Sequence, residues 1–94
     1  MSDIAPITLH TDASDYGVGG YLCQTVDGID QPVAFVSRFL NKSQLRWSAI
    51  QKEAYGIFYS CMYLQSLLRD RLFTIIGAGA VQTSKRYYKV VIGL

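Results

Sequence analysis

Charged residues are scarce in this sequence, and the scarcity argues against several classes of protein. They make up 17% of the 94 residues, while hydrophobic residues make up 50%, a balance opposite to that of disordered chains. The longest uncharged run, residues 54–68, is too short to span a bilayer, so no membrane partner is expected. The first residues contain no basic region followed by an apolar run. We therefore expect no signal peptide and an intracellular location, cytoplasmic or nuclear.

Cysteine is also rare, since only Cys23 and Cys61 are present and they form no Cys-x-x-Cys pair. We expect both to be small buried hydrophobic residues in a reducing compartment. The net charge of +2 does not by itself point to nucleic acid. The mean hydropathy of +0.17 is high for a domain of this size, and it favours an apolar surface that meets a partner.

The first third of the chain predicts two strands and a hairpin. Residues 7–13 alternate, so that one face carries Ile7 and Leu9 and the other carries Asp12. A turn follows, and residues 16–26 form a second strand thinned by glycine, which often marks the close approach of another backbone or a ligand. Asp27-Gly28 is a strong hairpin signal.

Residues 31–40 predict a third strand, and the continuous apolar segment 33–36 within it predicts burial on both faces. Ser48 and Gln51 then have the spacing of a capping box. The following apolar residues recur every three or four positions and predict a helix over residues 49–69 with one core stripe, made of Ile50, Ala54, Ile57, Cys61, Leu64 and Leu68.

Residues 71–76 predict a fourth strand, and residues 77–80 a flexible break. A helix between the meander and this strand lets the strand return parallel to the first, because parallel pairing needs a crossover connection. The expected fold class is therefore α/β: a three-stranded antiparallel meander, a long helix, and a fourth strand parallel to the first. The length allows one small domain, residues 1–94.

Two features of the helix bear on function. Glu53 falls at the edge of the core stripe and points towards the sheet, or else it is an exposed glutamate of the first turn that complements the helix dipole. Tyr55, Tyr59 and Tyr63 fall on the opposite face, the outward one, together with Lys52. This spacing predicts either an interaction face for a protein partner or a second copy, or packing against another element of the same chain.

Three segments, "HTDASDYGVGGYLCQ", "QPVAFVSRFLNKSQLRWSAIQKEAYGI" and "RLFTII", resemble the ribonuclease H domain of Ty3/gypsy-type retrotransposon reverse transcriptases. The resemblance runs from residue 7 to residue 76 and implies a partial ribonuclease H-like fold. The tail, residues 77–94, diverges. The resemblance also implies cleavage of RNA–DNA hybrids with two Mg²⁺ ions held by carboxylates, a chemistry that stabilises both the attacking and the leaving oxygen.

In this resemblance, Asp12 and Glu53 match the first two catalytic, metal-binding carboxylates. The third aspartate falls at or near Ala78, and no acidic residue occurs in residues 77–94. Magnesium relies on several carboxylate or phosphate contacts, so a site with two carboxylates is weak. We therefore expect no ribonuclease activity from the chain alone.

Three classes of function follow for this chain. The preferred one is a non-catalytic interaction or structural subunit of a larger assembly, with a protein partner or a second copy. The alternatives are an active RNA–DNA hybrid ribonuclease and a nucleic-acid-binding remnant. The basic and aromatic segment of the tail supports the last of these, because such a mixture can bind a nucleic-acid backbone and stack bases; it comprises Lys85, Arg86, Tyr87, Tyr88 and Lys89.

Overall fold

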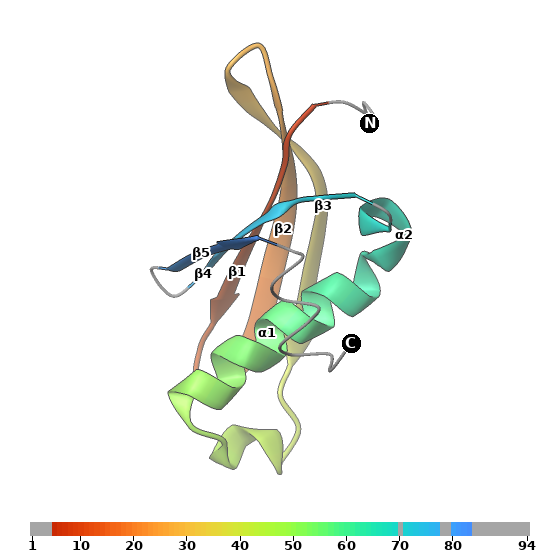
Figure 1. Cartoon of the computed structure of the whole chain (residues 1–94). Helices are drawn as coiled ribbons and strands as arrows, with labels where there is room; N and C mark the ends of the chain where they lie inside the picture. Colours follow the sequence, from red (N-terminus) through yellow and green to blue (C-terminus); the bar gives the residue numbers. More distant parts are fainter. Residues whose placement is uncertain (1–4, 70, 78–79, 84–94) are drawn as a thin grey trace.

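A computed structural model describes residues 5–69, 71–77 and 80–83, and the structural statements below concern these residues. They form one sheet with helices on one side (Figure 1). The elements in chain order are β1 (Ile7–Ala13), β2 (Gly17–Val26), β3 (Ile29–Phe39), the 3₁₀ helix η1 (Gln44–Arg46), α1 (Ala49–Tyr63), α2 (Gln65–Leu68), β4 (Thr74–Gly77) and β5 (Ala80–Thr83).

The strand order in the sheet is β3-β2-β1-β4-β5. Strand β1 pairs antiparallel with β2 and parallel with β4, so the predicted meander, helix and parallel return are confirmed. Strand β5 was not predicted. It pairs antiparallel with β4, with Gly77 opposite Ala80. The expected break at residues 77–80 is therefore wrong for Gly77 and Ala80, which belong to paired strands.

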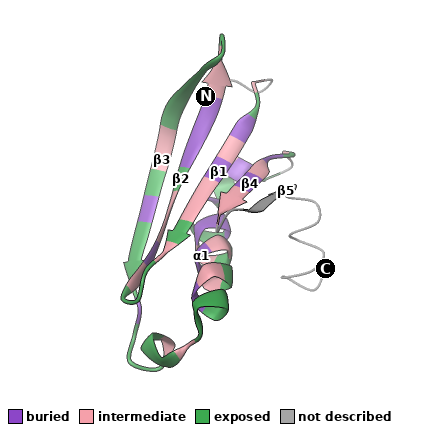
Figure 2. Ribbon diagram, turned by 90° about the vertical axis from the view of Figure 1, so that its left-hand side faces the viewer, coloured by how far each residue is buried: buried purple, intermediate pink, exposed green. Residues whose placement is uncertain are grey.

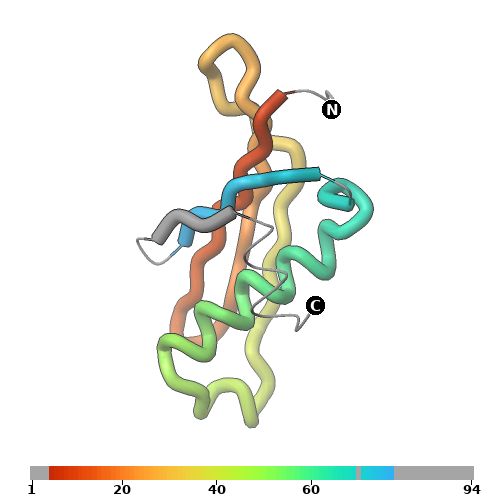
Figure 3. Tube along the Cα trace, in the orientation of Figure 1, coloured from red at the N-terminus to blue at the C-terminus, as the bar shows by residue number. Residues whose placement is uncertain are grey.

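The hairpin between β2 and β3 confirms the turn predicted at Asp27-Gly28. Both residues have positive φ angles, 52° and 77°, as a type I′ connection requires. The tip of this hairpin projects past the start of β1 (Figure 3), because β1 begins opposite Gln24 and the last residues of β2 pair only with β3.

The helical region begins where the sequence predicts and is shorter than expected. The Ser48 side chain accepts a hydrogen bond from the Gln51 backbone N–H, and the Gln51 side chain accepts one from the Ser48 backbone N–H, which confirms the capping box. Helix α1 ends at Tyr63. The φ of −97° and ψ of 13° of its C-cap residue, Leu64, are not helical, and α2 follows as a separate turn. The prediction of one continuous helix over residues 49–69 is therefore wrong.

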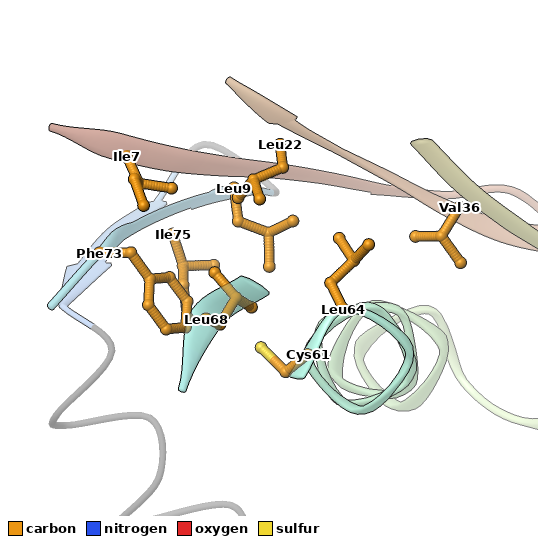
Figure 4. Close-up of a cluster of buried hydrophobic side chains, with 9 residues drawn as sticks. All are labelled: Ile7, Leu9, Leu22, Val36, Cys61, Leu64, Leu68, Phe73 and Ile75. Carbon is orange, nitrogen blue, oxygen red and sulfur yellow. The ribbon is translucent and has the colours of Figure 1, made fainter. Parts of the chain in front are cut away.

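The hydrophobic core lies between the sheet and the two helices (Figure 4). Its buried members come from β1, β2, β3, β4, α1, α2 and the residues around them: Ile7, Leu9, Leu22, Val36, Cys61, Leu64, Leu68, Phe73 and Ile75. In the described part of the chain, the helices cover only one face of the sheet (Figure 2). No helix in that part is long and apolar enough to cross a membrane.

The predicted core stripe is wrong at its start and confirmed further along. Ile50 is 78% exposed and Ala54 is also exposed, whereas Cys61, Leu64 and Leu68 are buried and Ile57 packs against the core. The other buried residues of α1 are Lys52, Gly56 and Ser60. The cause is close packing, because a Cβ atom placed on Gly20 of β2 would lie 2.5 Å from Ser60 Oγ. Small side chains on α1 therefore meet the strand that glycine thins.

Strand β3 is an edge strand, so the predicted burial of its central segment on both faces is wrong. Val36 is buried against the core, whereas Phe35 is 71% exposed. On the face of the sheet away from α1, three rings form a row across neighbouring strands. The ring centroids of His10 and Tyr21 are 4.4 Å apart, and those of Tyr21 and Phe35 are 6.1 Å apart.

Candidate functional site

A small cavity of about 30 Å³ lies where β1 and its parallel neighbour β4 both end. Carboxyl ends of adjacent parallel strands are the usual position of ligand sites in α/β sheets. The cavity is lined by Thr11, Asp12 and Ala13 of β1, Glu53 and Ile57 of α1, and Gly77 of β4. The two acidic residues chosen from the sequence, Asp12 and Glu53, thus line one cavity.

Asp12 is exposed, and strand alternation directs its side chain away from the face on which Ile7 and Leu9 are buried. Its Oδ1 atom accepts a hydrogen bond of 2.9 Å from the Ala13 backbone N–H. The end of β1 lies close to α1, because a Cβ atom on Gly56 would be 3.5 Å from the Asp12 carbonyl oxygen. This close approach lets a residue of α1 line the same cavity as Asp12.

Glu53 lies one turn before Gly56, is half-buried and lines this cavity. It also lines a second, polar hollow of about 180 Å³ between the β1–β2 turn and the start of α1, together with Ala13, Ser14, Asp15, Trp47, Ala49 and Lys52. Glu53 therefore connects the cavity at the strand ends to the space above the turn.

Lys52 is the residue of this region that sequence reasoning misplaced. It was assigned to the outward face, but it is only 8% exposed, and its Nζ donates a hydrogen bond of 3.0 Å to the Asp15 carbonyl oxygen. The turn itself is closed by Ser14, whose N–H donates to the Gly17 carbonyl oxygen and whose Oγ accepts from the Gly17 N–H. Lys52 thus ties the first turn of α1 to the turn after Asp12.

The resemblance assigns the third metal-binding aspartate to the end of β4. Gly77 lines the cavity, and Ala78, the residue that the resemblance assigns near the lost aspartate, lies outside the described residues. Within residues 5–69, 71–77 and 80–83, no group of three or more His, Cys, Asp or Glu side chains is placed to hold a metal ion. Asp12 and Glu53 alone do not fit a two-magnesium centre, which requires several oxygen ligands per ion.

The predicted interaction face does not lie opposite the sheet, and that part of the prediction is wrong. Tyr55 and Tyr59 are half-buried, and Tyr59 packs against the core. The side chains form a row along one flank of α1: Trp47 and Tyr55 have ring centroids 5.4 Å apart, Tyr55 and Tyr59 5.9 Å, and Tyr59 and Tyr63 6.0 Å. Arg38 of β3 lies over the Tyr59 ring at 5.2 Å. Only Tyr63, 64% exposed, is strongly accessible.

The basic segment of the tail, from Lys85 to Lys89, lies outside the described residues, so its role as a nucleic-acid contact stays a prediction. Both cysteines are free and buried, as expected. Burial raises the pKa of the Cys61 thiol to about 12, so this thiol stays protonated at neutral pH and is not a nucleophile.

The sheet order and the parallel β1–β4 pair are those of a ribonuclease H-like domain, and comparison with known proteins agrees. Residues 3–84 match the family described as the RNase H-like domain found in reverse transcriptase. The chain belongs to this family. The match extends past residue 76, where the resemblance found in the sequence ended, and includes β5.

A curated relative is the retrovirus-related Pol polyprotein from transposon opus of Drosophila melanogaster, 36% identical over 77 residues. The match covers 82% of this chain and 7% of the polyprotein, so the chain corresponds to a small part of that relative. The retrotransposon reverse transcriptase ancestry predicted from the sequence is confirmed by this relative and by the family match.

Two solved structures share the fold. The foamy viral protease-reverse transcriptase in complex with dsDNA has a TM-score of 0.67 and 16% identity, over 82% of this chain and 16% of that one. The same viral protein in complex with an RNA/DNA hybrid has a TM-score of 0.65 and 14% identity, over 96% of this chain and 12% of that one. At this level of identity the likeness concerns the fold.

Proposed function

We propose that this chain is a retrotransposon-derived RNase H-like domain that does not cleave RNA–DNA hybrids by itself and acts as an interaction subunit of a larger assembly. One observation carries the first half. Asp12 and Glu53 are the acidic residues that line the cavity at the ends of β1 and β4, its β4 wall is Gly77, and residues 77–94 contain no acidic residue.

The chemistry of phosphodiester cleavage explains why this observation supports the proposal. Hydrolysis by two Mg²⁺ ions places charge on the attacking and the leaving oxygen, and each ion must be held by hard oxygen ligands. Asp12 and Glu53 would be the residues that hold a metal ion here. Two carboxylates leave the ion dependent on water and on the phosphate of the substrate, so binding is weak. A fold of this kind can be retained when its chemistry is lost.

The exposed apolar surface supports the second half of the proposal. Large hydrophobic side chains are exposed on α1 at Ile50, Phe58 and Met62. Exposed apolar surface of this kind on a small domain usually marks contact with another protein.

A cleavage assay tests the proposal. The purified chain is incubated with an end-labelled RNA–DNA hybrid and Mg²⁺, beside the Asp12→Asn variant, and no cleavage above that of the variant is expected. Cleavage by the wild type that the Asp12→Asn change abolishes would show that the domain is an active hybrid ribonuclease and would overturn the proposal.

Nucleic-acid binding without cleavage is the remaining alternative. It is supported by the basic tail segment and by the foamy viral neighbour, whose structure contains an RNA/DNA hybrid. It is tested by titrating the same hybrid at several salt concentrations. Affinity that falls steeply as salt rises would favour this alternative, because each phosphate contact releases counterions.

A further inference from the structure

Helix α1 has a second apolar face, on the side away from the sheet. Ala54, Phe58 and Met62 follow one another at intervals of four residues, and Ile50 lies one turn before them; we call these four residues the outer stripe. Ile50 is 78% exposed, Met62 44% and Phe58 38%. A surface helix normally turns its apolar residues inward, but here Gly56 and Ser60 occupy the inward face and leave the larger side chains outside.

The outer stripe has no charged neighbours on α1. The helix contains two charged residues, and both turn away from the stripe: Lys52 is buried under the β1–β2 turn, and Glu53 lines the cavity with Asp12. The exposed faces of surface helices usually carry charged and polar side chains. An uncharged apolar face is therefore suited to burial against another surface, and it meets an identical face without charge repulsion.

The stripe also borders a hollow, and the partly exposed ring of Phe58 is one of its walls. An open, mostly apolar hollow of about 290 Å³ is lined by Trp47, Gln51, Ala54, Tyr55 and Phe58. An apolar cavity of about 150 Å³ is enough to hold benzene, so this hollow has room for a phenyl ring. Phe58 stands at its border. A face that carries both a partly exposed ring and an apolar hollow beside it can be complementary to itself.

We infer that α1 is the contact surface of a homodimer, in which two copies of the chain pack their outer stripes antiparallel about a two-fold axis. Phe58 of each copy enters the hollow beside Ala54 of the other. In a two-fold contact each patch must contain both a feature and its complement, which is what the stripe offers. This inference rests on the proposed role as an interaction subunit and identifies the partner as a second copy.

The size of the contact sets its strength. A helix of 15 residues is about 22 Å long, so one pair of helices buries less surface than a standard interface of about 1,600 Å². Contacts at the low end of this range are weak, and we expect a dissociation constant on the order of micromolar. The dimer should therefore form and dissociate within the concentration range of ordinary measurements.

Sedimentation equilibrium across a range of concentrations tests the inference. The mass of the wild-type chain should rise from that of one chain to that of two. Phe58→Glu places a charge in the hollow of the partner and should weaken association at least tenfold. Phe39→Glu is the matched control, because Phe39 is 86% exposed on β3, away from α1, and this change should leave association unchanged. Circular dichroism checks that both variants fold.

An exchange of ring and recess tests the geometry directly. Ala54→Phe fills the hollow and Phe58→Ala removes the ring, so each single change should weaken the dimer. The double variant again carries one ring and one recess and should recover at least part of the association. A wild-type chain that is monomeric at every concentration, or a Phe39→Glu chain that dissociates as much as Phe58→Glu, overturns the inference. Cleavage of a hybrid by the wild type would instead overturn the proposed function and leave the dimer intact.

Discussion

The contact between Gly20 and Ser60 determines how closely α1 packs on β2, and substitution of Gly20 measures it. In Gly20→Ala, the new Cβ would lie 2.5 Å from Ser60 Oγ, 3.1 Å from Ser60 Cβ and 3.2 Å from the His10 carbonyl oxygen. Ordinary van der Waals contacts of a Cβ begin at 3.4 Å, so the helix or the strand must move. Overpacking of this kind in a core costs about 1–3 kcal/mol of the free energy of unfolding.

A second substitution separates this contact from a general loss of stability. Ser60→Gly removes both near atoms and costs about 1 kcal/mol, since glycine is a poor helix former. In that background Gly20→Ala should cost at least about 1 kcal/mol less than it does in the wild type, because residues in contact are energetically coupled.

Urea unfolding followed by circular dichroism gives the four free energies of this cycle. All four proteins are measured at one concentration, because association adds to apparent stability. If the costs of the two substitutions simply add to within about 0.5 kcal/mol, the two residues are independent and the close packing described above is refuted.

Three further predictions concern the turn, the buried lysine and the buried thiol. Gly28→Ala should destabilise the chain by about 1 kcal/mol in urea unfolding, because Gly28 has a φ of 77°, which strains any residue with a Cβ atom. No atom lies within 4 Å of the new Cβ, so the cost comes from the backbone alone. Lys52→Met keeps the buried stem but loses the hydrogen bond to the Asp15 carbonyl oxygen, and it should cost about 1–2 kcal/mol by the same measurement. Because burial raises the pKa of Cys61 from 9.0 to about 12, its contribution to stability is complete below pH 9 and is lost as pH rises towards 12. Unfolding at pH 8 and pH 10, compared with a Cys61→Ala variant, checks this, and equal pH dependence of the two would contradict it.

The features predicted correctly from the sequence depend on residues close together in the chain. Asp27-Gly28 specifies its turn through its own backbone angles, and Ser48 with Gln51 specifies the start of α1 through hydrogen bonds three residues apart. Asp12 and Glu53, which the resemblance selected, line one cavity, and their role as metal ligands stays a prediction.

The first part of the helix face was mispredicted because hydrophobic periodicity considers apolar residues only. The periodicity assigned Ile50 and Ala54 to the core, whereas α1 packs so closely on Gly20 of β2 that Gly56 and Ser60 are buried there instead. Lys52 was missed for a related reason. A lysine on an amphipathic helix is normally a surface residue, and its acceptor is a backbone carbonyl 37 residues earlier, for which no sequence pattern exists.

Trp47, described above as the first ring of the aromatic row and a wall of the hollow, is also the single tryptophan of the chain. Tryptophan emission from this protein therefore depends on the surroundings of Trp47 alone. When a ring from outside enters the hollow and displaces water, the emission should move to shorter wavelength, without any label attached. The chain thus carries its own optical probe at the surface where we place its partner.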